Sequence, residues 1–459
     1  MSSPRALKVA VVGSGPAGFY TAAPLLASED PRVEVDMIER LPTPWGLVRL
    51  GVAPDHPELK AASRTFEKIA ALEGFRFLGN VEVGRDVGHE ELTRLYDAVV
   101  YAVGAQTDRR LGIPGEDLPG SWAATEFVAW YNGHPDYQHL RFDLQTERAV
   151  VIGNGNVAVD VARMLARTGE ELLPTDVTDQ AREAIAASGL REIVMLGRRG
   201  PAQAAFTPPE LKELGELAGA DVVVASAELE LDSASEAALE ADRARARRNV
   251  DILRAFAAHA PRGKPKRLVL RFCLSPVRIL GEGKVEAIEV VRNRLVVSDD
   301  GQIRAVATGE LEVIACGLVF RSVGYRGVPL PGLPFDDERG VIPNAGGRVL
   351  DGNGRPLPRT YCAGWIKRGP SGVIGTNKKD AAETVEALLE DVRAGRLLAR
   401  AADADTIDSL LAERGVEVVP YSGWEAIDRL ERARGSEQGR PRVKLSTWHD
   451  LLETARATV

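Results

Sequence analysis

The spacing of three glycines near the start of the chain is the first feature that could do chemistry. Gly13-x-Gly15-x-x-Gly18 stands between an apolar run of strand length and a helical stretch over about 19–27. Gly13 allows a tight turn, Gly15 lets the backbone approach a phosphate, and Gly18 lets the helix pack closely on the strand. Because a helix N-terminus also carries partial positive charge, this segment is predicted to bind the pyrophosphate of a dinucleotide.

An acidic residue follows the first glycine segment at the distance that suits ribose recognition. Glu39 ends the next strand-like run, which begins at Val33. A carboxylate about 20 residues beyond the glycines can accept hydrogen bonds from ribose hydroxyls, and it repels a ribose phosphate. The first site is therefore predicted to take FAD or NAD.

A second copy of the pattern lies further along the chain. Gly153-x-Gly155-x-x-Ala158 again follows an apolar strand-like run and precedes a helical stretch over 159–166. For either copy alone, a turn in a glycine-rich chain is the alternative, since 45 of the 459 residues are glycine. Two copies in the same strand and helix context favour two dinucleotide sites.

Two arginines stand where the first site has an acid. The strand-like run over 191–197 leads into Arg198 and Arg199. Guanidinium groups can chelate a ribose 2′-phosphate and stack on adenine, so the second site is predicted to bind NADP. The alternative is that both arginines are simply solvated at the end of a strand.

Further segments define the fold class. A buried-strand pattern from Tyr96 ends at Gly104, which we expect beside the first cofactor, and the run 359–365 leads to a glycine-rich helix entry over 369–375. That entry could cradle another part of the first cofactor. We therefore predict an α/β protein with two Rossmann-like three-layer dinucleotide-binding domains. The FAD domain, residues 1–105 and 326–459, is discontinuous and is interrupted by the NADP domain, residues 106–325.

Composition and charge exclude several classes of protein. The net charge of −8 and the lack of a long basic block argue against a nucleic-acid or anionic-membrane surface, and no run of about 18 apolar residues could span a membrane. Three widely separated cysteines form neither a disulfide framework nor a redox pair. We expect no metal site, and we expect a reducing compartment, the cytoplasm.

An arginine-rich segment lies within a predicted amphipathic helix over 233–260. It holds the strongest local positive charge of this acidic chain, from Arg243, Arg245, Arg247 and Arg248. Two interpretations stay open, a docking patch for an acidic protein partner and the solvated face of a helix.

Six longer motifs are spread over nearly the whole chain. They are Val12-Gly-Ser-Gly-Pro-Ala-Gly-Phe-Tyr20, Pro44-Trp-Gly-Leu-Val-Arg49, Gly51-Val-Ala-Pro-Asp-His-Pro57, Gly153-Asn-Gly-Asn-Val-Ala158, Gly197-Arg-Arg-Gly-Pro201 and Trp365-Ile-Lys-Arg-Gly-Pro-Ser-Gly372. In this order they resemble the adrenodoxin-reductase-like ferredoxin–NADP reductases, including the bacterial members. Glutamate-synthase small subunits and thioredoxin reductases are more distant relatives, and the lack of Cys-x-x-Cys argues against dithiol chemistry.

The resemblance implies cofactor contacts for particular residues. The phosphate and adenosine side of FAD would be contacted by Ser14, Ala17, Glu39, Leu47 and Val83. The flavin side would be contacted by Trp365, Gly372, Val373 and Ile374. The pyrophosphate turn for NADP would be made by Asn154, Gly155, Asn156 and Val157. The 2′-phosphate clamp would be made by Arg198 and Arg199, and Glu210 would be one further contact. Gly372 would approach both cofactors.

The resemblance also places three ionisable residues near the flavin ring, His56, Glu213 and Asp160. They could route protons or fix the nicotinamide. A histidine beside proline is more often structural, and Asp160 could serve only as a charge near a helix N-terminus.

These features together predict a ferredoxin–NADP reductase. NADPH would pass a hydride to FAD, and the reduced flavin would release single electrons to an iron–sulphur ferredoxin, because flavin converts a two-electron donor into two one-electron steps. Two alternatives stay open. One is an NADPH-dependent flavin oxidoreductase or diaphorase subunit that feeds a non-ferredoxin acceptor, as in glutamate-synthase-like assemblies, and the other is a non-catalytic dinucleotide sensor.

Overall fold

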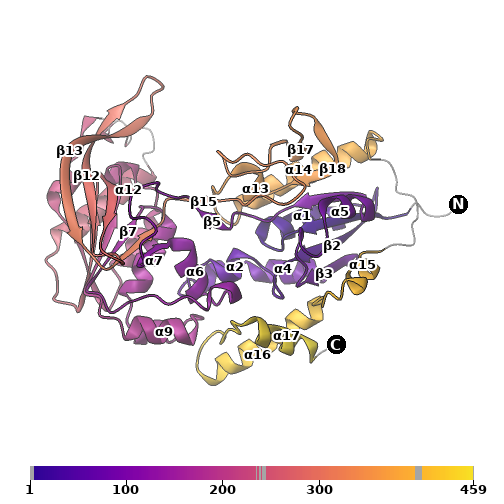
Figure 1. Ribbon diagram of the computed structural model, residues 1–459, viewed down its shortest axis with the longest axis horizontal. Coiled ribbons are helices and arrows are strands. Elements are labelled where there is room, and N and C mark those ends of the chain that lie inside the picture. Colours follow the sequence, from indigo (N-terminus) through magenta and orange to yellow (C-terminus); the bar gives the residue numbers. More distant parts are fainter. Residues whose placement is uncertain (1–4, 234, 237–238, 240–243, 398–405, 458–459) are drawn as a thin grey trace.

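The computed structural model describes residues 5–233, 235–236, 239, 244–397 and 406–457, which form two α/β halves around separate sheets (Figure 1). We call them the seven-stranded half and the six-stranded half after their main sheets. No helix in these ranges is both long enough and apolar enough to cross a membrane.

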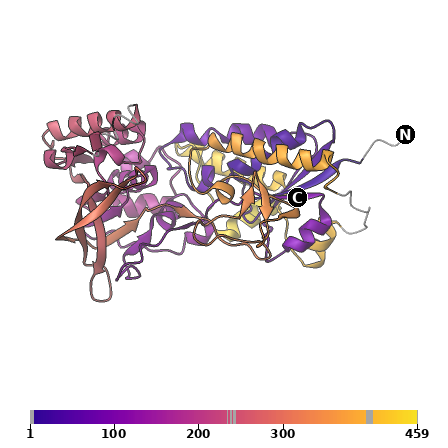
Figure 2. The same ribbon diagram turned by 90° about the horizontal axis from the view of Figure 1, so that it is seen from above.

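The seven-stranded sheet has the order β16-β17-β18-β4-β1-β2-β3. Its strands are β1 Leu7–Val12, β2 Val33–Glu39, β3 Phe75–Gly79, β4 Ala98–Tyr101, β16 Asn344–Ala345, β17 Arg348–Leu350 and β18 Pro356–Cys362. β18 pairs in parallel with β4, so segments from the two ends of the sequence share one sheet. The helices α1 (Pro16–Leu26) and α14 (Thr376–Arg393) lie side by side over one face, and α5 (His89–Leu95) packs on the other (Figure 2).

The six-stranded sheet is parallel throughout and has the order β6-β14-β7-β8-β10-β9. Its strands are β6 Ser121–Ala123, β7 Arg148–Ile152, β8 Glu192–Leu196, β9 Ala220–Val224, β10 Lys266–Arg271 and β14 Leu318–Arg321. One face is buried by α6 (Ala124–Tyr131), α7 (Asn156–Ala166), α10 (Pro208–Leu214) and α12 (Arg245–Ala258). The predicted fold class, two Rossmann-like sheets in an α/β protein, is confirmed.

The other face of the six-stranded sheet carries a second sheet instead of helices. Val150, Ile152 and Val194 pack there against β11 (Leu274–Leu280), β12 (Ala287–Val297) and β13 (Ile303–Ala315), which form an antiparallel sheet. β12 and β13 make a long hairpin that projects from this half (Figure 1). This antiparallel layer is not predicted from the sequence.

The chain passes between the halves at two neighbouring places. β5 (Thr107–Asp108) leads into the six-stranded half, β15 (Tyr325–Arg326) leads out of it, and the two pair in antiparallel fashion. Figure 1 shows this pair between the two sheets.

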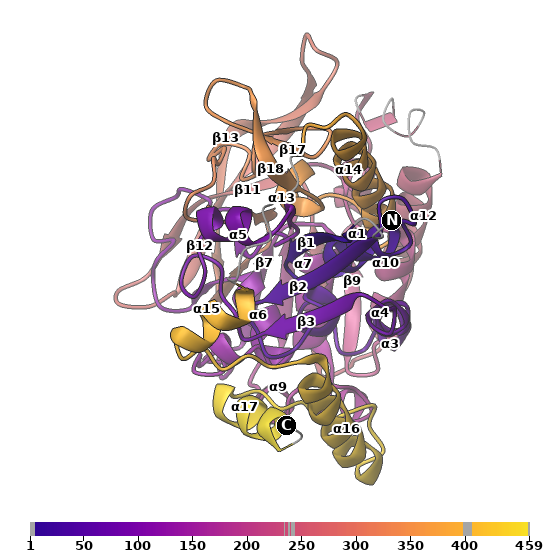
Figure 3. The same ribbon diagram turned by 90° about the vertical axis from the view of Figure 1, so that its right-hand side faces the viewer.

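Three helices near the C-terminus pack on the outside of the seven-stranded half (Figure 3). They are α15 (Ile407–Glu413), α16 (Tyr421–Glu437) and α17 (Trp448–Arg456). Trp424 and Leu451 belong to the same apolar cluster as Val9 of β1 and Phe19 of α1. These helices are therefore an integral part of the core.

The shorter helices are α2 Leu47–Leu50, α3 Pro57–Lys60, α4 Ser63–Ala70, α8 Gly169–Leu172, α9 Asp179–Ala186 and α13 Trp365–Arg368. α8 and α9 fall in the stretch between the helix that follows Ala158 and the strand before Arg198, for which no element is predicted. The helix predicted over about 19–27 is α1, and it begins a few residues earlier, at Pro16.

Candidate active site and cofactor sites

The first glycine turn has the shape that a pyrophosphate requires. Gly13 has a φ of +101°, and a Cβ there would lie 2.6 Å from the carbonyl oxygen of Ala102. A Cβ on Gly18 would collide with the carbonyl oxygen of Gly13. The nearest atom to a Cβ on Gly15 is 4.0 Å away, so the backbone is open on that side. Gly13 and Gly18 are needed for packing, and Gly15 leaves room at the N-terminus of α1 for a phosphate.

Glu39 ties the first turn to the end of β2. Its Oε2 accepts hydrogen bonds from the Ser14 amide (3.0 Å) and the Ser14 hydroxyl (2.7 Å), and its Oε1 accepts one from the Leu41 amide (3.0 Å). A carboxylate can accept about four hydrogen bonds, so one direction stays available for a ribose hydroxyl.

The predicted flavin-side residues gather at the start of α1. Gly364 has a φ of +79° and packs so closely on Ala17 that a Cβ on Gly364 would collide with the Ala17 side chain. Trp365 begins α13, and its Nε1 donates to the Ser371 carbonyl oxygen (3.2 Å). The Trp365 and Tyr325 rings lie 5.4 Å apart. The predicted residues Gly372, Val373 and Ile374 follow on the same segment, with Val373 exposed and Ile374 against the core beside α1.

Three further predicted FAD contacts lie around the same edge. The segment before Leu47 crosses the first turn, where the Trp45 amide donates to the Ser14 carbonyl oxygen (2.9 Å). Gly104 has a φ of +71° with open space where a Cβ would stand. Val83 is buried in the apolar cluster that contains the ends of β1 and β2. The structure thus places the predicted FAD residues along the carboxyl edge of the seven-stranded sheet, where ligands of such sheets bind.

The second glycine turn repeats the geometry of the first. Gly153 has a φ of +134° and packs against Ser322, whereas nothing lies within 4 Å of a Cβ on Gly155. The Asn154 carbonyl oxygen accepts from the Phe206 amide (2.9 Å), and the Asn156 Oδ1 accepts from the Thr207 amide (2.8 Å). Val157 follows in the first turn of α7. These bonds attach the segment before α10 to the turn, so a dinucleotide held there would lie beside the side chains of α10.

The two predicted clamp arginines follow the end of β8. Arg198 is exposed and Arg199 is half-buried. Neither guanidinium has an ion-pair partner within the described part of the chain. Burial and the neighbouring Arg198 charge both lower the pKa of Arg199. Two adjacent, uncompensated cations are the donor set that a phosphate would satisfy.

The structure brings the three predicted catalytic residues into one cluster. His56 Nε2 lies 2.7 Å from Glu213 Oε2 and 3.8 Å from Glu210 Oε2. Arg163, whose side chain is completely buried, donates to Asp160 (2.7 Å) and to Glu210 (3.2 Å) and lies 3.5 Å from Glu213. His56, Glu210 and Glu213 are close enough to share a metal ion, but Arg163 already supplies a cation to both glutamates.

Burial and charge act in opposite directions within this cluster. Burial raises the pKa of Asp160 to about 7, and Arg163 only partly offsets that effect. Burial also raises the pKa of Asp55, but Arg163 and Arg167 outweigh it and hold that pKa below its usual range. Asp160 is therefore a group of this cluster whose charge changes near neutral pH.

The arginine-rich segment lies on the helix next to this cluster. Arg245, Arg247 and Arg248 are exposed in the first turn of α12, and Arg243 lies outside the described residues. α12 packs against α10, the helix that carries Glu210 and Glu213. Positive side chains at a helix N-terminus oppose the helix dipole, so they do not stabilise this helix.

Comparisons with known proteins show the family of the chain. The family described as pyridine nucleotide-disulphide oxidoreductase matches residues 7–195. NADPH-ferredoxin reductase FprA of Mycobacterium tuberculosis (strain ATCC 25618 / H37Rv) is 51% identical over 457 residues, which cover 98% of this chain and 99% of that protein. A mitochondrial NADPH:adrenodoxin oxidoreductase of Arabidopsis thaliana is 43% identical over 467 residues, which cover 99% of this chain and 96% of that protein.

The chain belongs to the adrenodoxin-reductase-like family of NADPH–ferredoxin reductases. The family predicted from the six motifs is confirmed. A solved structure of Mycobacterium tuberculosis FprA in complex with NADPH superposes on this chain with a TM-score of 0.94 at 50% sequence identity, covering 98% of this chain and 100% of that one. The arrangement of the two halves is thus shared within the family.

Sequence reasoning misses two residues that organise the site of this family member. Arg163 carries the charge that joins Asp160 to Glu210, and Asp55 joins the loop before α3 to α7. The i,i+3 spacing of Asp160 and Arg163 is a signal that could have indicated their pairing on one helix face. The position of Asp55 beside Arg163 depends on the packing of the two halves, which no local pattern reports.

Proposed function

We propose that this protein is an FAD-dependent NADPH–ferredoxin reductase. The observation that carries the proposal is the pair of open glycine turns, one followed by the carboxylate of Glu39 and the other by two uncompensated arginines. The first turn suits FAD and the second suits NADPH, because only NADPH has a 2′-phosphate for Arg198 and Arg199. The relatives named as ferredoxin and adrenodoxin reductases support this assignment.

The proposed roles of the side chains follow from their places. When bound, FAD accepts a hydride from NADPH and gives up single electrons to an iron–sulphur acceptor. Ser14, Ala17 and Leu47 would hold FAD at the first turn, and Trp365 with Tyr325 would cover the flavin side. His56 and Glu213 hold a proton between Nε2 and Oε2, and Arg163 fixes the position of that pair.

The proposed boundaries follow the two crossings at β5 and β15. Residues 1–105 and 326–459 form the FAD domain, and residues 106–325 form the NADP domain. The sheet membership of β4 and β18 supports this division. Three free cysteines, Cys273, Cys316 and Cys362, support a reducing compartment, the cytoplasm.

The proposed partner is an acidic iron–sulphur ferredoxin that docks at the start of α12. The support is the exposed charge of Arg245, Arg247 and Arg248 beside the helix that carries Glu213. Complementary charge mainly raises the rate of encounter, so the patch would act through association kinetics.

Anaerobic mixing of the FAD-loaded protein with NADPH tests the function. We expect rapid bleaching of the flavin absorbance, followed by reduction of an added ferredoxin faster than reduction of a free one-electron dye such as ferricyanide. Absence of bleaching would leave a dinucleotide sensor. Bleaching with a ferredoxin rate no higher than the dye rate would instead indicate a flavin oxidoreductase for another acceptor.

A further inference from the structure

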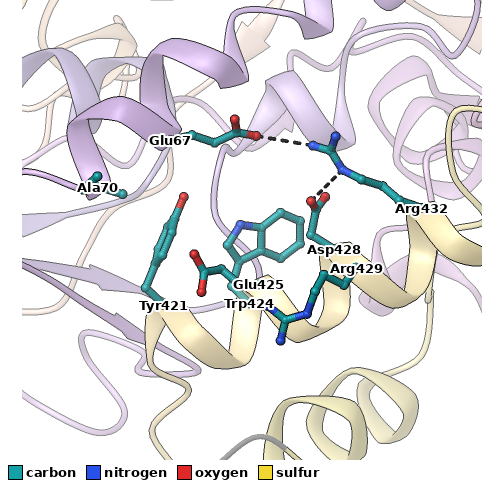
Figure 4. A pocket seen from close by; sticks show the side chains of 9 residues that line it. Glu67, Ala70, Tyr421, Trp424, Glu425, Asp428, Arg429 and Arg432 are labelled. Atoms are coloured by element: carbon teal, nitrogen blue, oxygen red, sulfur yellow. Dashed lines mark hydrogen bonds and ion pairs between the residues drawn. The ribbon is translucent and has the colours of Figure 1, made fainter.

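The segment 421–456, which we call the C-terminal arm, is anchored on the seven-stranded half by apolar packing. It comprises α16, α17 and the connection between them. Trp424 is 1% exposed and its ring lies 4.8 Å from that of Trp45, and Ile427, Leu451 and Ala455 are buried in the same cluster. A pocket of about 460 Å³ between α4 and α16 leaves the rim of this contact open (Figure 4). Rim ion pairs such as Arg432 with Glu67 (3.4 Å) contribute little, so the buried side chains provide the anchor.

The contacts of the arm with the six-stranded half are polar. Arg440 donates to the carbonyl oxygens of Thr175 (3.0 Å) and Val177 and pairs with Asp179 (2.5 Å) at the start of α9. Trp448 Nε1 donates to Asp136 Oδ1 (2.7 Å). The apolar cluster of the six-stranded half, as far as the structure describes it, contains no residue of the arm.

A buried lysine makes the central contact. Lys444 Nζ, whose side chain is 1% exposed, donates to Asn132 Oδ1 (3.0 Å) and lies 3.3 Å from Asp176 Oδ2. Lys60 of α3 lies 2.5 Å from the other oxygen of Asp176. Burial raises the pKa of Asp176 and lowers those of Lys444 and Lys60, but the two lysines together hold the pKa of Asp176 at about 2. One carboxylate of the six-stranded half thus forms ion pairs with two lysines of the other half.

The same part of the arm also holds the segment that carries Leu47. Lys444 donates to the Arg49 carbonyl oxygen (3.2 Å), and the Arg49 guanidinium pairs with Glu431 through two bonds of 2.8 and 2.5 Å. Arg49 stands two residues after Leu47, a proposed FAD contact. The arm therefore connects the segment at one cofactor site to the half that carries the other site.

We propose that Arg440 and Lys444 are positioning residues that hold the six-stranded half at the separation where nicotinamide meets flavin. The inference rests on the proposed function. If the halves moved apart, Asp176 and the Lys444 ammonium would lose buried partners, and such charges are costly to leave unpaired. Hydride transfer needs the reacting atoms in near contact, so a small displacement slows it strongly.

The test compares two substitutions with a matched control. Arg440→Gln and Lys444→Met remove contacts with the six-stranded half, whereas Arg456→Gln removes an arginine of the same arm that pairs with Glu417 (2.5 Å) of the seven-stranded half. In anaerobic stopped-flow mixing we expect at least a tenfold slower flavin reduction at saturating NADPH for the first two variants and no change for the control. Arg440→Lys should recover part of the rate. Dye reduction by dithionite-reduced enzyme should be unchanged in every variant.

Unchanged flavin reduction in folded Arg440→Gln and Lys444→Met would overturn the inference, as would an equal loss in dye reduction. Trp448→Phe, which removes only one hydrogen bond near the surface, serves if the buried variants do not fold, and it should slow flavin reduction two- to threefold. Small-angle X-ray scattering gives a reading that does not depend on turnover. We expect a larger radius of gyration for Arg440→Gln than for wild type, and an unchanged radius would count against the role of the arm. Failure of NADPH to bleach the wild-type flavin would instead refute the proposed function, and it would leave the scattering result valid as a test of the arm.

Discussion

Removing the charge of Arg199 should change the choice between NADPH and NADH. Arg199 is half-buried and has no ion-pair partner among the described residues, so a bound 2′-phosphate would be its counterion. A hydrogen bond between two charged groups contributes about 2 kcal/mol, which corresponds to about a 30-fold change in affinity. We therefore expect Arg199→Gln to weaken NADPH about 30-fold and to leave NADH nearly unchanged.

Substituting both arginines should weaken NADPH binding more than either single substitution does, but by less than the product of the two single fold-changes. The Arg198 charge contributes to lowering the pKa of Arg199, so the two cations repel each other in the free protein. Removing either one relieves that repulsion, and adjacent sites of this kind are not additive. Arg198→Gln combined with Arg199→Gln should thus abolish most of the NADPH preference.

The assay is anaerobic flavin reduction over a range of NADPH and NADH concentrations. Arg304→Gln is the control, because Arg304 is an exposed arginine on the β12–β13 hairpin that pairs only with Asp300 (2.8 Å) in the described structure. Equal losses with both nucleotides would refute the clamp and would mean that the two arginines act on the fold of the turn.

Three further outcomes are expected. Gly155→Val should keep the melting temperature and weaken NADPH at least tenfold in a binding titration, because nothing lies within 4 Å of a Cβ at Gly155; a loss of folding would contradict the open turn. Because burial raises the pKa of Asp160 to about 7, its stabilising contribution is present below pH 4 and is lost as the pH rises through 7. Chemical denaturation measures the free energy of unfolding of wild type and of Asp160→Asn. The difference, wild type minus variant, should fall by at most about 4 kcal/mol between pH 4 and pH 7. If the two proteins lose stability in parallel with pH, the raised pKa of Asp160 is excluded. The third change replaces the three exposed arginines of α12, Arg245, Arg247 and Arg248, with glutamine. It should slow ferredoxin reduction about tenfold at low salt, with little effect at high salt or on dye reduction. An unchanged salt dependence would mean that these arginines only form the solvated face of a helix.

The parts of the fold that could be predicted from the sequence are those with local signals. β2 runs from Val33 to Glu39 as predicted, because its apolar residues are bounded by loop residues on one side and by the acid on the other. The glycine turns could be predicted because only glycine fits the crowded positions at Gly13 and Gly153. The motif resemblance added His56 and Glu213, which lie 2.7 Å apart although the sequence separates them widely.

The parts that could not be predicted depend on tertiary contacts. Nothing near Lys444 in the sequence indicates a partner, since Asp176 belongs to the other half of the molecule. The sequence of the C-terminal arm therefore looks ordinary, although the side chains of Arg440 and Lys444 are each only 1% exposed. The β12–β13 hairpin did carry a local signal in the turn 298–302, where Gly301 adopts a φ of +75° between two strands rich in β-branched residues.

The pairing of β4 with β18 has a consequence for how the chain folds during synthesis. The strands of the six-stranded sheet lie between Ser121 and Arg321, so that sheet can form before the rest of the chain has left the ribosome. The seven-stranded sheet must wait for Pro356–Cys362, and until then β4 presents an unpaired edge of buried-type residues. Exposed edges of this kind template pairing with other chains. Nascent chains stalled before Pro356 are therefore species from which aggregation should start.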